Sequence, residues 1–237
     1  MSYTIQKETT FQRVRRVFVQ SLNGEEQDYT TGSIDRAIVL LAIPMILEMA
    51  MESLFAVVDA FFVAKIGVEA VATVGLTESM LMLVYSIAIG LSAAATAMVA
   101  RRIGEGDRDA AAKAGAQVIL IAVILSGVIA VPGYFYAEDL LRLMAHDTSV
   151  SETGFHFTRL LLTANLPILL LWMLNGIFRG AGDAATAMRA LWIANGVNII
   201  LCPVLIFGWG PFPAMGVIGS GVATTIGRSS GVAYQLW

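Results

Sequence analysis

The stretch IDRAIVLLAIPMILEMAMESLFAVVDAFFVAKI, residues 34–66, decides the fold of this chain. Its residues are almost all apolar, as a helix that lies in lipid requires. At about 1.5 Å per residue, one helix of this length is more than long enough to cross a hydrocarbon core of ~30 Å. The stretch therefore predicts a membrane-spanning helix, which we place at residues 34–65.

Three carboxylates interrupt this apolar helix: Glu48, Glu52 and Asp59. At ~100° per residue they fall within about 40° of one another and form one acidic stripe. A carboxylate at membrane depth is costly, by roughly 2.5 kcal/mol or more for Asp at a helix centre, so it normally faces protein or a water-filled cavity. The stripe either anchors the helix by polar contacts or binds a proton or cation. For Asp59 we favour binding, and for the two glutamates both interpretations stay open.

Composition places the chain among polytopic membrane proteins. Of its 237 residues, 57% are hydrophobic and only 14% are charged, whereas a soluble domain has about 25% charged residues. The net charge of −3 does not favour a nucleic-acid partner. The single cysteine, Cys202, excludes an intrachain disulfide and a metal site built from cysteines alone. No cofactor is expected, and the polar N-terminus predicts no cleavable signal peptide.

The apolar segments predict an all-α membrane protein with a cytoplasmic tail at residues 1–33 and a six-helix bundle at residues 34–237. Helices are expected at 34–65, 72–100, 110–131, 153–178, 185–208 and 216–237. The third should end near Pro132-Gly133, before a short amphipathic segment at 137–145. In the tail, apolar residues recur at helical spacing between arginines, which suits either an interfacial helix on anionic lipid or a solvated tail: Phe11, Val14, Phe18 and Leu22.

Loop charges predict the orientation. Basic residues gather in the tail and in the connections after helices two and four, among them Arg101, Arg102 and Arg179. The connections after helices three and five are acidic or uncharged. The positive-inside rule then places the N-terminus in the cytoplasm, and an even number of helices returns the C-terminus to the same side of the cell membrane.

The fifth and sixth helices carry further polar residues. Asn195, Asn198 and Cys202 fall within about 60° on one face of the fifth helix. The two amides either bridge helices or hydrogen-bond a carboxylate, a cation or a substrate. In the sixth helix Arg228 must pair with an acid, reach the interface or face water, and the two stripe glutamates are candidate partners.

Five segments, in this order, resemble the N-terminal half of the MATE (multidrug and toxic compound extrusion) family: LAIPMILEMAMESLFAVVDAFFVAKIGVEAVATVGL, ARRIGEGDRDAA, FRGAGDAATAM, NIILCPVLIFG and GVATTIG. The resemblance runs from about Gly32 onward. It implies a cation-coupled antiporter that exports drugs or other organic, often cationic, compounds in exchange for H⁺ or Na⁺. Family members have twelve membrane helices in two six-helix lobes around a central cavity, so this chain corresponds to one lobe.

The resemblance also implies a coupling site. The family's acidic residue in the first helix corresponds to Asp59, within VVDAFFV, and its threonine in the sixth helix corresponds to Thr224. Of its N-x-x-x-D/N pattern in the fifth helix, Asn198 matches the first position, but Cys202 stands at the second. A thiol is a poor partner for Na⁺, so we expect proton coupling. The remaining candidates for lining the cavity are Glu48, Glu52, Asn195, Cys202 and Arg228.

Since only one lobe is present, we expect a fragment that lacks its C-terminal lobe, rather than a half-transporter that pairs with a second copy. Three other functions compete with antiport. A flippase for lipid-linked precursors tends to need a basic cavity, which the acidic stripe disfavours. An intramembrane enzyme would need a nucleophile–base pair, and none is evident. A non-transporting membrane scaffold remains an alternative if the chain is complete.

Overall fold

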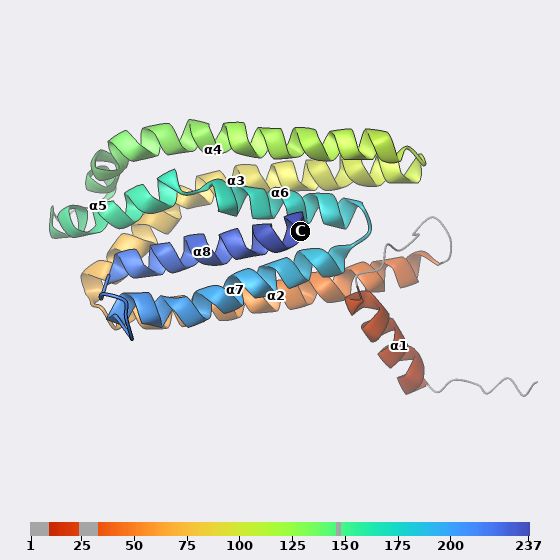
Figure 1. The fold of residues 1–237 in the computed structure, drawn as a ribbon, viewed down its shortest axis with the longest axis horizontal. Helices are drawn as coiled ribbons and strands as arrows, with labels where there is room; N and C mark the ends of the chain where they lie inside the picture. The colour runs from red at the N-terminus through yellow and green to blue at the C-terminus, as the bar shows by residue number, and fades with distance from the viewer. Residues whose placement is uncertain (1–9, 24–32, 146–147) are drawn as a thin grey trace, which may run out of the picture.

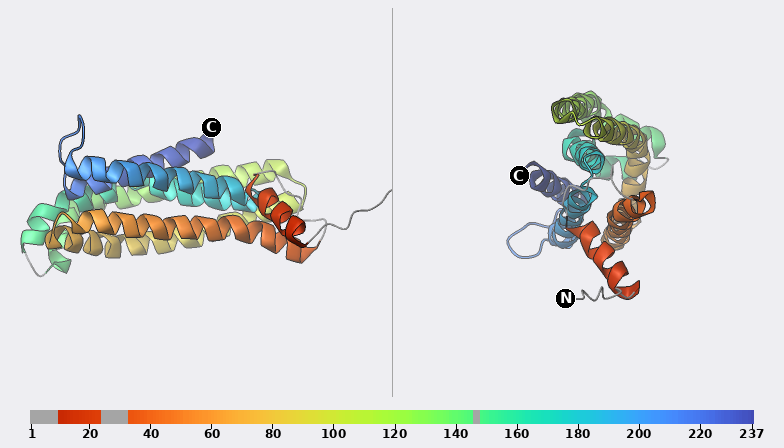
Figure 2. Two further views of the ribbon diagram at one scale, coloured as in Figure 1. Left: turned by 90° about the horizontal axis from the view of Figure 1, so that it is seen from below. Right: turned by 90° about the vertical axis from the view of Figure 1, so that its right-hand side faces the viewer.

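The computed structural model describes residues 10–23, 33–145 and 148–237, and this part of the chain is a bundle of helices (Figure 1). The helices are α1 (Thr10–Leu22), α2 (Ile34–Ala64), α3 (Val68–Gly104), α4 (Arg108–Met144), α5 (Thr148–Thr163), α6 (Leu166–Gly180), α7 (Ala184–Phe207) and α8 (Val217–Leu236). The long helices run side by side along the bundle, and α1 projects from one end (Figures 1 and 2). The predicted all-α class is confirmed.

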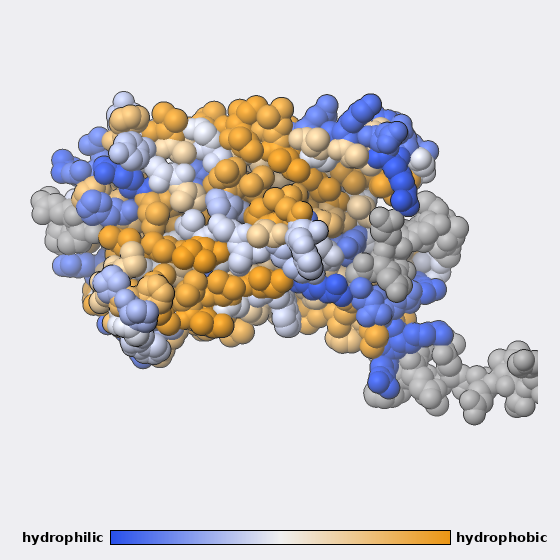
Figure 3. Space-filling view, viewed as in Figure 1, coloured by the Kyte–Doolittle hydropathy of each residue, from blue (hydrophilic) through white to orange (hydrophobic). Residues whose placement is uncertain are grey.

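Apolar side chains cover the middle of the bundle, and hydrophilic ones gather toward both ends (Figure 3). Among the described residues, four helices are long and apolar enough to cross a membrane, or five if the bent pair α5–α6 is one span. The helix α8 completes the bundle, but Gly, Ser, Thr and Arg228 lower its apolarity. Length and composition alone therefore support four or five membrane-spanning helices, and the predicted count of six is approximate.

The prediction that the third membrane helix ends near Pro132 is wrong, because α4 continues through Pro132 to Met144. The segment 137–145 is the last part of this helix, apart from its C-cap Ala145. Proline removes one backbone hydrogen bond, but packing can offset that loss. Ala137 and Leu141 are fully buried, and Gly133 lies directly against Leu162 of α5. These contacts hold the helix together past the proline.

The predicted fourth helix is two helices, α5 and α6, which meet at a bend of 42°. Pro167 lies in the first turn of α6, where a missing backbone N–H breaks no helical hydrogen bond. The proline thus lies just after a break between two helices.

Small residues let neighbouring helices approach closely. Between α3 and α6, Ser92 donates to the carbonyl of Trp172 at 2.8 Å, and Thr96 donates to that of Gly176 at 2.9 Å. Between α7 and α8, Gly227 lies against the Ala194 carbonyl. The antiparallel register of α7 and α8 that follows from this contact positions their polar residues.

The helix α2 packs chiefly against α7 (Figure 1). The helix α1 spans the predicted interfacial segment from Phe11 to Leu22. Arg36 of α2 donates to Gln20 of α1 at 2.9 Å. Residues 1–9 and 24–32 of the predicted tail lie outside the described residues. Placement of α1 on a membrane surface stays a prediction.

Candidate functional site

The three carboxylates of α2 each meet partners at a different level of the bundle. All three side chains are half-buried, and each accepts hydrogen bonds from helices distant in sequence. The predicted stripe is therefore a line of three polar contacts along the face of α2 that lies toward α6, α7 and α8.

Asp59 is held by one residue from α7 and one from α8. Its Oδ1 accepts a hydrogen bond from Ser220 Oγ at 2.9 Å and one from Cys202 Sγ at 3.3 Å. Cys202 is fully buried, so this carboxylate meets the interior of the bundle. Glu78 of α3 lies close enough to Asp59 to interact with it electrostatically.

The other two predicted coupling residues form a pair of their own. Asn198 Nδ2 donates to Thr224 Oγ1 at 2.9 Å. Each lies one helical turn from a partner of Asp59, about 6 Å along the helix axis. Among the described residues no hydrogen bond joins Asp59 to Asn198 or Thr224, and the buried Asn198 Oδ1 has no partner.

Glu52 pairs with Arg228, for which the sequence offers Glu48 and Glu52 as candidate partners. Arg228 Nη2 lies 2.7 Å from Glu52 Oε1, and Nη1 lies 3.4 Å from Oε2. Asn195 Nδ2 donates to the same Oε2 at 2.9 Å. The guanidinium also lies over the Phe55 ring, with Cζ at 5.3 Å from the ring centroid. This ion pair ties α2 to α8.

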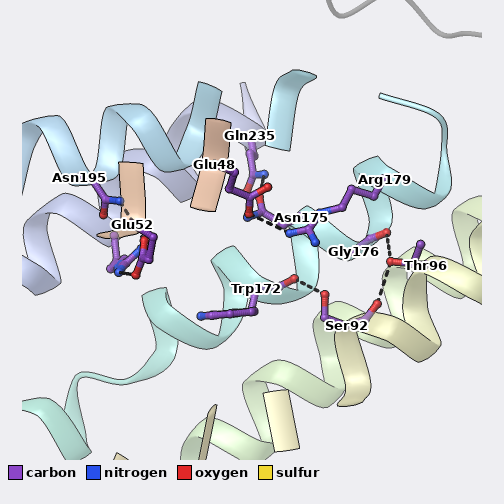
Figure 4. A network of polar contacts seen from close by, with 11 residues as sticks. Glu48, Glu52, Ser92, Thr96, Trp172, Asn175, Gly176, Arg179, Asn195 and Gln235 are labelled. Atoms are coloured by element: carbon purple, nitrogen blue, oxygen red, sulfur yellow. Dashed lines mark hydrogen bonds and ion pairs between the residues drawn. The ribbon is translucent and has the colours of Figure 1, made fainter. Parts of the chain in front are cut away.

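Glu48 pairs with Arg179, which the sequence places in a loop but the structure places in the last turn of α6. Arg179 Nη2 lies 2.9 Å from Glu48 Oε1, and Asn175 Nδ2 donates to the same oxygen at 3.3 Å. Gln235 of α8 in turn donates to Asn175 Oδ1 at 2.6 Å. Figure 4 shows this network joining α2, α6 and α8.

A cavity of about 240 Å³ opens beside Glu48. Four of its lining residues are polar or charged: Glu48, Glu52, Asn175 and Arg179. The other five are apolar or aromatic: Met45, Met49, Leu171, Trp172 and Leu191. The two glutamates line this cavity, whereas Asn195, Cys202 and Arg228 contact the carboxylates without lining it. A role of any of these residues in transport stays a prediction.

Sequence reasoning missed Ser220 and Gln235, and it gave Arg179 no partner. A register for the last two helices would have indicated Ser220, because an antiparallel pair that brings residue 198 to residue 224 also brings residue 202 to residue 220. No comparable signal exists for Arg179, because a helix end that turns back toward a neighbouring helix depends on tertiary packing. In the part of the chain that the structure describes, no group of three or more His, Cys, Asp or Glu residues could hold a metal ion.

Comparison with known proteins gives a family match. The MatE family model matches residues 44–204. A "FAD transporter" from Shewanella oneidensis is 30% identical over 196 residues, which is 82% of this chain and 43% of the relative. The "Probable multidrug resistance protein YoeA" of Bacillus subtilis is 30% identical over 84% of this chain and 43% of its own length.

Solved structures give the same result. A MOP superfamily transporter from Pyrococcus furiosus superimposes with a TM-score of 0.79 at 30% identity, and the match covers 97% of this chain and 47% of that one. A multidrug resistance MATE family transporter in an outward-facing conformation gives the same values. The chain spans about half the length of the relatives that it matches.

Proposed function

The chain belongs to the MATE family, and from this membership we propose that it forms the N-terminal lobe of a cation-coupled antiporter that exports organic compounds. The observation that carries the proposal is the Asp59 carboxylate, which lies at membrane depth and accepts hydrogen bonds from both α7 and α8. A carboxylate so placed is costly unless it has a function or a satisfying partner. In the proposed coupling, protonation of Asp59 weakens these two hydrogen bonds and so changes how α2 packs against α7 and α8.

The groups around Asp59 support a proposal of proton coupling. Its two hydrogen-bond donors are the Ser220 hydroxyl and the Cys202 thiol. Protonation removes the negative charge that strengthens these bonds, so α2 is released from α7 and α8 at this level. Na⁺ prefers oxygen ligands, and the thiol of Cys202 occupies one of the positions around the carboxylate. A proton therefore suits the site better than Na⁺.

Coupling requires two states of the lobe with different affinities for the ion, because a ligand shifts an equilibrium only through differential binding. We assign these states to two placements of α2. In one, Asp59 is ionised and bonded to Ser220 and Cys202. In the other, Asp59 is protonated and α2 is displaced, and this state releases the exported compound to the outside.

The proposed orientation has the N-terminus in the cytoplasm of a cell whose plasma or inner membrane holds the protein. The α3–α4 and α6–α7 connections lie at the same end of the bundle as α1 (Figure 1), and the last turns of α3 and α6, which lead into them, carry Arg101, Arg102 and Arg179. One end of the bundle is thus the basic end, as the positive-inside rule requires of the cytoplasmic side.

Transport by proteoliposomes tests the function. Vesicles with the chain alone, and vesicles with the chain plus a second MATE lobe, are loaded at acidic pH and diluted into alkaline buffer. Uptake of a fluorescent organic cation is then followed. We expect uptake only with both lobes, driven by the proton gradient and not by an outward Na⁺ gradient at constant pH. Uptake driven by Na⁺ alone would contradict proton coupling, and no uptake with either gradient would contradict antiport.

A further inference from the structure

Arg159 of α5 is the one arginine of helices α5–α8 whose side chain has no polar partner among the described residues. Arg179 and Arg228 pair with glutamates of α2, and Arg189 donates to the carbonyl of Leu22. No hydrogen bond or ion pair joins the guanidinium of Arg159 to a described residue. Its Nε is enclosed by protein, whereas Nη1 and Nη2 are accessible. The described part of the chain thus supplies no anion for this charge.

Two aromatic rings hold the guanidinium in place. Its Cζ lies 5.0 Å from the ring centroid of Phe155 in the same helix and 5.5 Å from that of Tyr134 in α4. Such contacts stabilise a cation, and here they fix the planar guanidinium where α4 and α5 meet. They leave its charge uncompensated, because an aromatic ring carries no net charge.

The sequence of α4 places this group at the edge of the apolar band. Residues 114–137 of α4 carry no charge and span about 36 Å, which exceeds the ~30 Å of a hydrocarbon core. Tyr134 lies about 6 Å inside Glu138, where the charged end of α4 begins. Arg159 therefore lies at the level where hydrocarbon gives way to lipid headgroups, at the end of the bundle away from α1 (Figures 1 and 3).

The protein surface beside the guanidinium is suited to lipid. Tyr134, Phe135 and Tyr136 are 56%, 67% and 59% exposed, so their rings lie on the outside of α4. Exposed aromatic side chains are typical of the boundary between hydrocarbon and headgroups. The anions present at this boundary are lipid phosphates. A free anion in water gains nothing from the exposed rings, so the surface favours a phosphate that is attached to acyl chains.

We propose that Arg159, Tyr134 and Phe155 form a binding site for the phosphate of an anionic phospholipid in the leaflet away from α1. The guanidinium can donate two hydrogen bonds to one phosphate through its accessible Nη atoms. Because no described residue neutralises the arginine, a lipid with a net negative charge fits better than a zwitterionic one. The bound lipid bridges α4 and α5. The site requires only that the chain lies in a membrane, so it does not depend on a coupling role for Asp59.

Native mass spectrometry of the purified chain in detergent tests the proposal, because it resolves each bound lipid. The probes are phosphatidylglycerol, phosphatidylcholine and diacylglycerol with the same acyl chains, and inorganic phosphate. We expect the chain to retain at least one more molecule of phosphatidylglycerol than of the other two lipids. Arg159→Gln should lower the population that carries this additional molecule about 5-fold. The matched control is Arg142→Gln at the same end of the bundle, which should change it less than 2-fold, because Arg142 is exposed and already paired with Glu138.

A second pair of variants decides the matter if Arg159→Gln does not fold. Tyr134→Leu removes a ring that holds the guanidinium and should lower the same population about 3-fold, as expected for loss of an exposed cation–π contact. Tyr136→Leu removes a similarly exposed ring that lies over no arginine among the described residues, and it should leave the population unchanged.

Equal retention of phosphatidylglycerol and phosphatidylcholine, or an undiminished population in Arg159→Gln, would overturn the proposal. Displacement of phosphatidylglycerol by millimolar inorganic phosphate would also overturn it, because the site would then bind a free anion. Since no transport is measured, a failure here is separate from any failure of antiport.

Discussion

At the scale of single residues, the acidic stripe differs from one position to the next in what holds each carboxylate. Glu48 and Glu52 meet arginines, whereas Asp59 meets a hydroxyl and a thiol. Ion pairs inside a bundle hold elements in place, and among the described residues no ion pair involves Asp59. The sequence indicated the stripe from helical periodicity. It named both glutamates as candidate partners of Arg228, but it could not choose between them or find the partners of Glu48 and Asp59, because these depend on how the helices pack.

Loss of Glu52, whose partner arginine is 10% exposed, should lower stability more than loss of Glu138, whose partner arginine is 57% exposed. Glu52→Gln leaves the buried guanidinium of Arg228 without its carboxylate. Breaking a fully buried pair costs ~3–5 kcal/mol. Since the Glu52 side chain is 39% exposed, we expect the free energy of unfolding to fall by about 2 kcal/mol, within the ordinary range for single mutations. Denaturant unfolding of the chain in detergent measures this change.

Glu138→Gln is the matched control, because Glu138 forms an exposed pair with Arg142. It should change the free energy of unfolding by less than ~1 kcal/mol. The double variant Glu52→Gln/Arg228→Gln should be more stable than Glu52→Gln alone, because no charge is left unpaired. Equal effects of Glu52→Gln and Glu138→Gln would show that the inner pair does not stabilise the bundle.

At the scale of helices, the sequence predicted the apolar segments but not all their ends. The helix α2 agrees closely with its predicted range, because a long apolar run between polar ends is a strong signal. Pro132 predicted the end of a helix, but tertiary packing lets α4 continue past it. Proline reports a local cost to the backbone, and burial of Ala137 and Leu141 offsets that cost only in the folded bundle.

Close helix packing predicts that two glycine substitutions act in opposite directions. In Gly176→Ala on α6, the new Cβ would lie 2.6 Å from the Ser92 carbonyl oxygen of α3, which is rigid backbone. Overpacking of this kind costs ~1–3 kcal/mol, which exceeds the ~0.5–1 kcal/mol that alanine gains over glycine in a helix. We expect a lower midpoint of unfolding.

Gly90→Ala on α3 provides the comparison, because among the described residues nothing lies within 4 Å of the position that its new Cβ would take. Here the helix propensity of alanine acts alone, and the unfolding midpoint should stay the same or rise. If both alanines shift the midpoint in the same direction, close contact between α3 and α6 is not what requires the glycine.

At the scale of the whole molecule, an apolar band covers the middle of the bundle between two hydrophilic ends (Figure 3). The family resemblance indicated Asp59 from a sequence motif, and the structure adds its partners. The cavity at Glu48 was beyond the reach of sequence, because it forms where α2, α6 and α7 meet without filling the space between them.

Thiol labelling in intact cells tests the orientation. The native thiol, Cys202, is buried, and Cys202→Ser removes it. In that background, Phe212→Cys in the α7–α8 connection should react with an impermeant maleimide. Glu105→Cys in the α3–α4 connection should react only after the cells are permeabilised. The opposite pattern would invert the proposed topology.

Transport by an Asp59→Asn variant tests the central claim most directly. In proteoliposomes that hold both lobes and an acidic interior, uptake of a fluorescent organic cation should fall to the level of protein-free vesicles, because an amide cannot exchange the proton. Asp109→Asn, at an exposed aspartate in the first turn of α4, should keep normal uptake. Normal proton-driven uptake by Asp59→Asn, in a variant that inserts and folds, would contradict a coupling role for this carboxylate.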